Sequence, residues 1–247
     1  MRDEQVRPEA PAFYAMRSGG WRDYVTVLHP PYTAWHLSYV ALGWAAAPAA
    51  HTDRLIAGLI AFFLGVGVGA HALDELNGRP LRTAISSRTL VGCAALSIAL
   101  ACAIGVAGAA RTSWWLLPFV GFGGFIVCAY NLEWFGGRFH GDFWFALAWG
   151  AFPAIVASWA NALRFSAEGI LVAAACFALS AAQRTLSTPV RDLRRRTRGV
   201  DGTIERNDGT VERIDAELLR SAPESALRWL SLALPLLAAG AVVAKLT

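Results

Sequence analysis

Apolar residues in this chain are gathered into long blocks separated by polar connections. Seven blocks can be distinguished, at 27–49, 54–74, 89–110, 113–131, 142–161, 167–187 and 226–246. Each is close to the ~20 residues that an α-helix needs to cross the ~30 Å hydrocarbon core of a bilayer. The pattern therefore predicts an all-α, polytopic membrane helix bundle with about seven transmembrane helices.

The composition excludes an ordinary soluble domain. Of the 247 residues, 55% are hydrophobic and 16% are charged, whereas soluble domains are about a quarter charged. The four cysteines lie within the apolar blocks, where they behave as small apolar side chains. We expect one transmembrane domain at 27–247 after an N-terminal segment at 1–26, with membrane lipids rather than nucleic acid as its surroundings.

The distribution of basic residues predicts the orientation of the bundle. If the N-terminus is cytoplasmic, 18 of the 22 Lys and Arg residues lie on the inner side, and four lie outside: Arg54, Arg111, Arg164 and Lys245. Cytoplasmic connections carry an excess of Lys and Arg. We therefore expect a multi-pass protein of the cytoplasmic (inner) membrane with a cytoplasmic N-terminus, and any active site or ligand entrance on the cytoplasmic face.

One polar stretch, at 188–225, is longer than the other connections. Within it the sequences DGTIER and DGTVER repeat seven residues apart, and β-prone residues alternate with charged ones around Asn207-Asp208-Gly209. This pattern predicts a short β-hairpin. Because two strands alone are marginally stable, we expect the hairpin to fold against the cytoplasmic surface, as a lid over the site.

The second apolar block ends in four residues on one helical face. His71, Asp74, Glu75 and Gly78 fall at positions i, i+3, i+4 and i+7. An ionisable side chain inside a membrane costs on the order of 2.5 kcal/mol or more, so these residues are functional candidates. They suit Mg²⁺, a transition metal or proton handling. The alternative is that the helix has already reached the interface, where the carboxylates are solvated.

Aromatic and polar residues are interleaved after the fourth block. Tyr130, Asn131 and Arg138 belong to the segment YNLEWFGGRFHGDFWFALAWG. An aromatic belt at the headgroup level is one interpretation. The other is an apolar wall with polar groups at its rim, suited to a substrate with an apolar tail and a charged head.

The sixth block ends in a basic segment. Gln183, Ser187 and Arg191 are spaced i, i+4 and i+8, although Pro189 is expected to break or kink the helix before Arg191. Five arginines lie between 191 and 198. They could anchor anionic lipids, or their guanidinium groups could bind a diphosphate bidentately.

Four stretches share an order and a predicted side of the membrane with a known family. They are LHPPYTAWHLSYVALGWA in the first block, Arg79-Pro80-Leu81 with Ile85-Ser86, the segment from Tyr130 to Phe152, and Arg191-Asp192-Leu193 with Gly199. In these stretches the chain resembles the UbiA-type intramembrane prenyltransferase superfamily. The resemblance covers most of residues 25–200.

The resemblance implies an activity. Members of the superfamily hold an isoprenyl diphosphate through Mg²⁺ bound by two Asp-rich motifs. They ionise the allylic C–O bond and pass the prenyl group to an aromatic or other lipid-forming acceptor. Here the resemblance implies that the catalytic and Mg²⁺-binding residues are Asp74, Glu75 and Asp192. It implies that the residues binding the substrate are His71, Arg79, Tyr130, Asn131, Arg138, Gln183 and Arg191.

The acidic motifs differ from those of the family. Of the three Asp residues in the first motif, Asp74 is kept, with Glu75 beside it. In the second motif, Pro189 and Arg196 stand where the residues flanking Asp192 are acidic. Three possibilities stay open: the diphosphate is held with fewer metals and more arginine, the donor differs, or the chain is a relative without transfer activity.

Two other classes of function compete with a prenyltransferase. One is a non-catalytic isoprenoid- or lipid-binding membrane protein, or a partner subunit of the same fold. The other is a transporter or channel, although inverted repeats and broken helices are not evident in the sequence. A retinal protein is excluded because the single lysine, Lys245, lies at the outer end. His29, His36 and His51 are interpreted as structural or interfacial.

Overall fold

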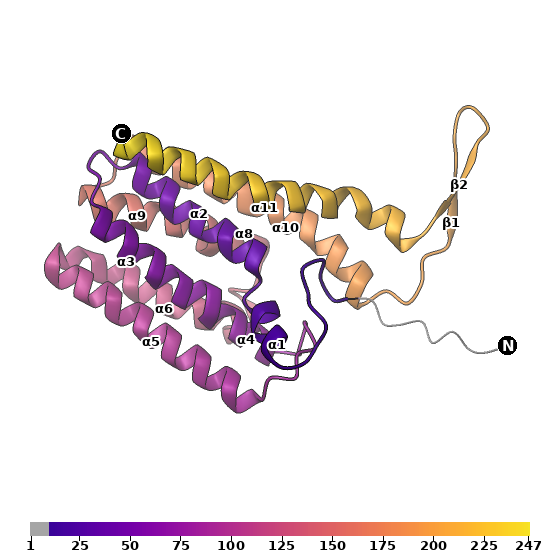
Figure 1. Ribbon diagram of the computed structural model, residues 1–247, viewed down its shortest axis with the longest axis horizontal. Coiled ribbons are helices and arrows are strands. Elements are labelled where there is room, and N and C mark those ends of the chain that lie inside the picture. Colours follow the sequence, from indigo (N-terminus) through magenta and orange to yellow (C-terminus); the bar gives the residue numbers. More distant parts are fainter. Residues whose placement is uncertain (1–9) are drawn as a thin grey trace.

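The computed structural model describes residues 10–247 and shows a bundle of long helices with a β-hairpin projecting at one end (Figure 1). The α-helices are α1 (Trp21–Val27), α2 (Pro30–Ala46), α3 (Thr52–Phe62), α4 (His71–Leu76), α5 (Ser87–Arg111), α6 (Leu117–Asn131), α7 (Trp134–Gly137), α8 (Asp142–Phe145), α9 (Phe152–Ala162), α10 (Ala167–Arg195) and α11 (Ala216–Leu246). The remaining elements are two π-helical segments, η1 (Phe63–Ala70) and η3 (Ala146–Ala151), a 3₁₀ turn, η2 (Trp114–Leu116), and the strands β1 (Gly202–Glu205) and β2 (Val211–Ile214).

Among the described residues, six continuous helical stretches are long and apolar enough to cross a membrane. They are Thr52–Leu76, Ser87–Arg111, Trp114–Asn131, Asp142–Ala162, Ala167–Arg195 and Ala216–Leu246. The prediction of an all-α bundle typical of a membrane protein is confirmed at this level. The predicted first span at 27–49 corresponds to α2, which has 17 residues. The count of seven crossings and the cytoplasmic N-terminus stay predictions.

Helix α2 lies against several neighbours and supplies much of the core. The side chains of Trp35, Tyr39 and Trp44 are fully buried, and the helix packs mainly against α9 and α11 (Figure 1). Its sequence is apolar on nearly every face, as expected for a helix surrounded by others. Gly43 allows the contact with α9, because a Cβ there would lie 2.1 Å from the Ala154 carbonyl oxygen.

Local sequence explains where the long helices begin. Ser86, Ser166 and Asp215 precede α5, α10 and α11, and each side chain accepts a hydrogen bond from the backbone N–H three residues on. A break or a kink was predicted at Pro189, and the break is wrong, because α10 continues to Arg195. A proline inside a helix removes one backbone hydrogen bond. Helix α10 packs against η3, α9 and α11, and tertiary packing of this kind contributes most of the stability of a helix.

The hairpin forms as predicted, but it does not act as a lid. Strands β1 and β2 pair antiparallel, with Gly202 opposite Ile214. The turn is held by Asp208, whose carboxylate accepts hydrogen bonds from the backbone N–H and hydroxyl of Thr210. Figure 1 shows the hairpin extending away from the bundle. Most of its side chains are exposed, and the two isoleucines on one face, Ile204 and Ile214, share it with Glu212. The hairpin therefore offers little apolar area to the helices.

Candidate functional site

A polar cavity of about 330 Å³ opens at the end of the bundle where α4 and α10 end. Its wall comes mainly from α2, α4, α6, η3 and α10. Of the ten residues predicted for the site, seven line this cavity: His71, Asp74, Tyr130, Asn131, Gln183, Arg191 and Asp192. Residues from three separate predicted clusters are therefore brought together in space.

Glu75 lies outside the cavity and holds a loop. Its carboxylate is fully buried. It accepts hydrogen bonds from the backbone N–H of Leu81, and from the N–H and hydroxyl of Thr83, at 2.8–2.9 Å. These three bonds fix the chain that connects α4 to α5. Because the carboxylate is directed to this loop, the structure does not bring Glu75 together with Asp74 in the cavity wall.

Arg79 and Arg138 also lie outside the cavity wall. The Arg79 guanidinium donates to the Ile85 carbonyl and to the Ser87 hydroxyl, so it braces the same loop as Glu75. Arg138 is exposed on the segment between α7 and α8. From that segment His140 reaches the cavity instead, with its ring Nδ1 2.9 Å from the Tyr130 carbonyl oxygen.

The cavity wall also includes His29 and His36, although the sequence suggested a structural or interfacial role for both. The ring of His29 stacks on that of His71, with centroids 4.1 Å apart and planes 12° from parallel. Within residues 10–247, Nε2 of His29 is buried without a hydrogen-bond partner, and so is Oη of Tyr130. His36 lies two turns after His29, on the same side of the chain, and also lines the cavity. This seven-residue spacing was the signal available in the sequence.

Arginines from one face of α10 supply the positive charge of the cavity. Arg184, Arg191 and Arg195 are spaced i, i+7 and i+11, and all three line the wall. Arg184 forms an ion pair with the largely exposed Asp142, at 2.9 Å. Within the described chain, Arg191 forms no ion pair, and its guanidinium donates to the Thr188 hydroxyl at 3.2 Å. Positive charge is therefore available to a ligand.

The N-terminal segment covers this cavity, in the place predicted for the hairpin. Pro11 to Tyr14 form part of the cavity wall. Guanidinium groups of α10 donate to the carbonyls of Ala10 and Pro11, both at 3.1 Å. The Tyr14 hydroxyl lies 3.0 Å from Nδ1 of His29. Burial raises the pKa of Tyr14, so this phenol stays neutral.

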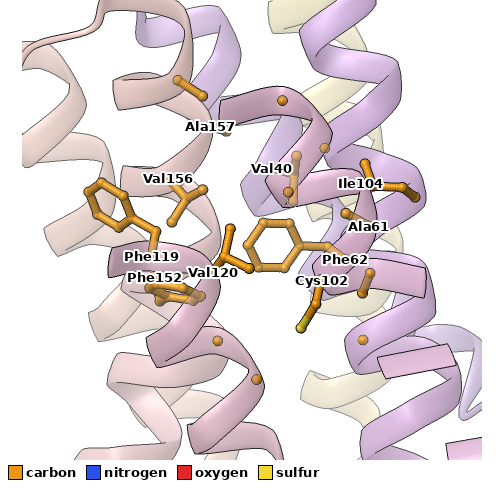
Figure 2. Close-up of a pocket in the computed structure, with 18 of the residues that line it drawn as sticks. Val40, Ala61, Phe62, Cys102, Ile104, Phe119, Val120, Phe152, Val156 and Ala157 are labelled. Atoms are coloured by element: carbon orange, nitrogen blue, oxygen red, sulfur yellow. The ribbon is translucent and has the colours of Figure 1, made fainter. Parts of the chain in front are cut away.

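A second, apolar cavity of about 170 Å³ lies deeper in the bundle, between α3, α5, α6 and α9. Figure 2 shows Phe119 and Phe152 on one side of it and Phe62 and Cys102 on the other. Small residues of α3 and α5 leave the space. Trp149 is part of the wall of both cavities.

The residues predicted to bind Mg²⁺ are divided between the polar cavity and the loop before α5. Within residues 10–247, no group of three or more His, Cys, Asp or Glu side chains is arranged to hold a metal ion. Asp74 and Asp192 line the polar cavity, while Glu75 is used by the loop. Two of the three predicted ligands therefore share one cavity wall, and the Mg²⁺ site stays a prediction.

Comparison with family models, with curated proteins and with solved structures found no match. The resemblance to UbiA-type prenyltransferases therefore depends on the sequence stretches quoted above. The features of this chain that bear on its function are the polar cavity and the arginine and aromatic side chains that line it.

Proposed function

We propose that this protein is a UbiA-like membrane prenyltransferase, which transfers an isoprenyl group from an isoprenoid diphosphate to a lipid-forming acceptor. The observation that carries the proposal is one cavity whose wall combines three arginines of α10 with several aromatic rings. In this proposal α2 and the six longer helices cross the membrane, and the cavity opens on the cytoplasmic face, where the arginine-rich connections lie.

The arginines support an anionic headgroup as ligand. A guanidinium group matches two phosphate oxygens at once, and it remains charged at every physiological pH. Arg191 and Arg195 would contact the diphosphate from one helical face, and His29 and Tyr130 offer polar atoms that lack partners among the described residues. A buried polar group without a partner is costly, so a ligand that supplies the missing hydrogen bonds is stabilised there.

The aromatic residues support an allylic chain beneath the headgroup. The ring of Trp149 lies 4.6 Å from that of Tyr130 and stacks parallel to that of Phe145, 6.1 Å away. Such rings exclude water and present π-faces, which attract positive charge. An allylic cation formed on the headgroup side of these rings would be protected from hydrolysis.

The proposed reaction breaks the bond between the allylic carbon and the diphosphate oxygen. The electron pair leaves with the diphosphate, and Arg191 and Arg195 stabilise the charge that develops on it. The acceptor then forms a bond to the allylic carbon and loses a proton. Asp74 lines the cavity without a hydrogen bond or ion pair among the described residues, so it is the carboxylate assigned to take that proton.

The alternative is an isoprenoid- or lipid-binding membrane protein without catalysis. One observation favours it: Glu75, expected to complete the acidic site, is instead bonded to its own loop. The two functions share the anionic ligand and differ in turnover. Release of diphosphate from an allylic diphosphate, with a panel of aromatic acceptors, separates them.

A binding isotherm tests the shared part of the proposal. Geranylgeranyl diphosphate is titrated into the purified protein, with Mg²⁺ and then with EDTA, for the wild type, Arg191→Gln and Arg198→Gln. Arg198 is exposed and outside the cavity wall, which makes it a matched control. We expect Arg191→Gln to weaken binding at least about tenfold, or ~1.4 kcal/mol, and the control to match wild type. Absence of binding to the wild type in both buffers would contradict both functions.

A further inference from the structure

The two cavities of the bundle meet at one side chain. Trp149 lines the polar cavity on one side and the apolar cavity on the other. Its indole is almost fully buried, with 4% of the residue exposed. A ligand that had its head in the polar cavity and entered the apolar cavity would have to pass this ring.

The apolar cavity has the shape and lining expected for a hydrocarbon chain. Ile98 and Gly108 both line it, so it follows α5 for about 15 Å at a rise of 1.5 Å per residue. That is about half of the ~30 Å hydrocarbon core of a bilayer. Arg54 also lines this cavity, and its guanidinium donates to the Ala160 carbonyl at 2.8 Å.

The backbone holds Trp149 between the cavities. It belongs to the π-helical segment η3, and such segments are frequent at functional sites. The next residue, Gly150, is pressed against α10, where a Cβ would lie 2.6 Å from the Cys176 carbonyl oxygen. The segment therefore cannot retreat toward α10, and passage between the cavities requires the indole itself to rotate or to be shortened.

We infer that the apolar cavity binds the hydrocarbon chain of the same ligand whose anionic head occupies the polar cavity, and that Trp149 determines which chain lengths enter it. The inference rests on the proposed function, because it needs a ligand with an anionic head. The shared wall at Trp149 favours this occupant over a bilayer lipid, which would have no reason to lie beside the polar cavity. A short chain ends at the indole, whereas a long chain continues into the space shown in Figure 2.

The first experiment fills the apolar cavity from α5. Ala101 lines the cavity, and Ala103, two residues on, is exposed and does not. Binding of inorganic diphosphate, geranyl diphosphate and geranylgeranyl diphosphate is measured for the wild type, Ala101→Phe and Ala103→Phe. We expect Ala101→Phe to weaken geranylgeranyl diphosphate at least about tenfold, with the two smaller probes unchanged. Ala103→Phe should match wild type for all three.

The second experiment changes Trp149, the side chain that lies between the two cavities. Trp149→Ala should raise the preference for geranylgeranyl over geranyl diphosphate several-fold, while Trp149→Phe keeps a ring in place and should retain the wild-type preference. A general loss of structure would weaken all probes together and leave their ratio unchanged. The ratio therefore reports on chain selection rather than on folding.

The outcomes separate this inference from the proposed function. If the wild type binds none of the three probes, both are overturned. If it binds them and Ala101→Phe leaves geranylgeranyl diphosphate unaffected, the inference alone is overturned. The inference is also overturned if Ala101→Phe displaces a co-purified bilayer lipid without weakening geranylgeranyl diphosphate, because the cavity then holds an independent acyl chain.

Discussion

Asp74 and Glu75 are adjacent on α4, yet the two sides of this helix have different surroundings. Asp74 faces the polar cavity, and within the described residues its carboxylate makes no hydrogen bond or ion pair. Glu75 points to the loop before α5, and its carboxylate accepts three hydrogen bonds. Adjacent helical residues point about 100° apart, so one acidic pair divides between a group that is free to act on a ligand and a group that holds the fold.

The largest effect is expected on stability, from a change at Glu75, which faces the loop. Glu75→Ala removes the acceptor for three buried donors, at Leu81 and Thr83, and should reduce the free energy of unfolding by about 3–5 kcal/mol. Thermal unfolding in detergent measures the loss. A variant that melts with the wild type would show that the carboxylate does not hold the loop.

The cavity side should respond in activity rather than in stability. Asp74→Ala removes the carboxylate assigned to the acceptor proton, so turnover should fall by about 100-fold or more. The melting temperature should stay within a few degrees of wild type, because no described group loses a hydrogen bond. Diphosphate release in the presence of aromatic acceptors gives the rate, and unchanged turnover would remove Asp74 from the mechanism.

A smaller effect is expected where the N-terminal segment meets the cavity. Tyr14→Phe deletes the hydroxyl that lies 3.0 Å from His29, which should cost about 1 kcal/mol of stability. Tyr24→Phe is the matched control, because Tyr24 is half exposed. Equal melting temperatures for the two variants would mean that the contact at His29 contributes nothing measurable.

The smallest effect is expected at the hairpin, which lies away from both sides of α4. Hydrogen bonds from Thr210 lower the pKa of Asp208, so the charged form stabilises the turn at neutral pH. This contribution is present above the ordinary Asp value and is lost as the pH falls through the lowered pKa. NMR titration of the turn should show that low transition. Asp208→Ala should leave ligand affinity at the wild-type value. Weaker binding would indicate that the hairpin does act as a lid over the cavity.

Periodicity and residue type were sufficient to predict the helices and part of the site. The spacing of Gln183 and Arg191 suits one helical face, and although a break or kink was expected at Pro189, both residues line the cavity because α10 continues past it. The side that an acidic residue faces was less predictable. Asp74 and Glu75 share the apolar turn and the charge that made both candidates, and their difference comes from the loop that happens to pack beside Glu75.

The sequence also failed to predict that His29 and His36 line the cavity. His29 precedes two prolines and has a left-handed backbone, with φ of 47°, which begins α2. Nothing in the sequence near His29 indicates that it stacks on His71, because the stacking depends on how α2 packs against η1, which leads into His71. His36 follows His29 by seven residues, which places the two on one side of the chain, but the same spacing is also typical of a buried helix face.

The sequence by itself determined that this chain forms a bundle of apolar helices, where most of these helices begin and end, and which end of the bundle is rich in arginine. These properties follow from hydropathy, capping residues and charge, which are local in the chain. Tertiary structure alone decided that Glu75 serves a loop, that the N-terminal segment rather than the hairpin covers the cavity, and that Trp149 divides two cavities. Each of these depends on contacts between segments far apart in the sequence, which local patterns do not encode.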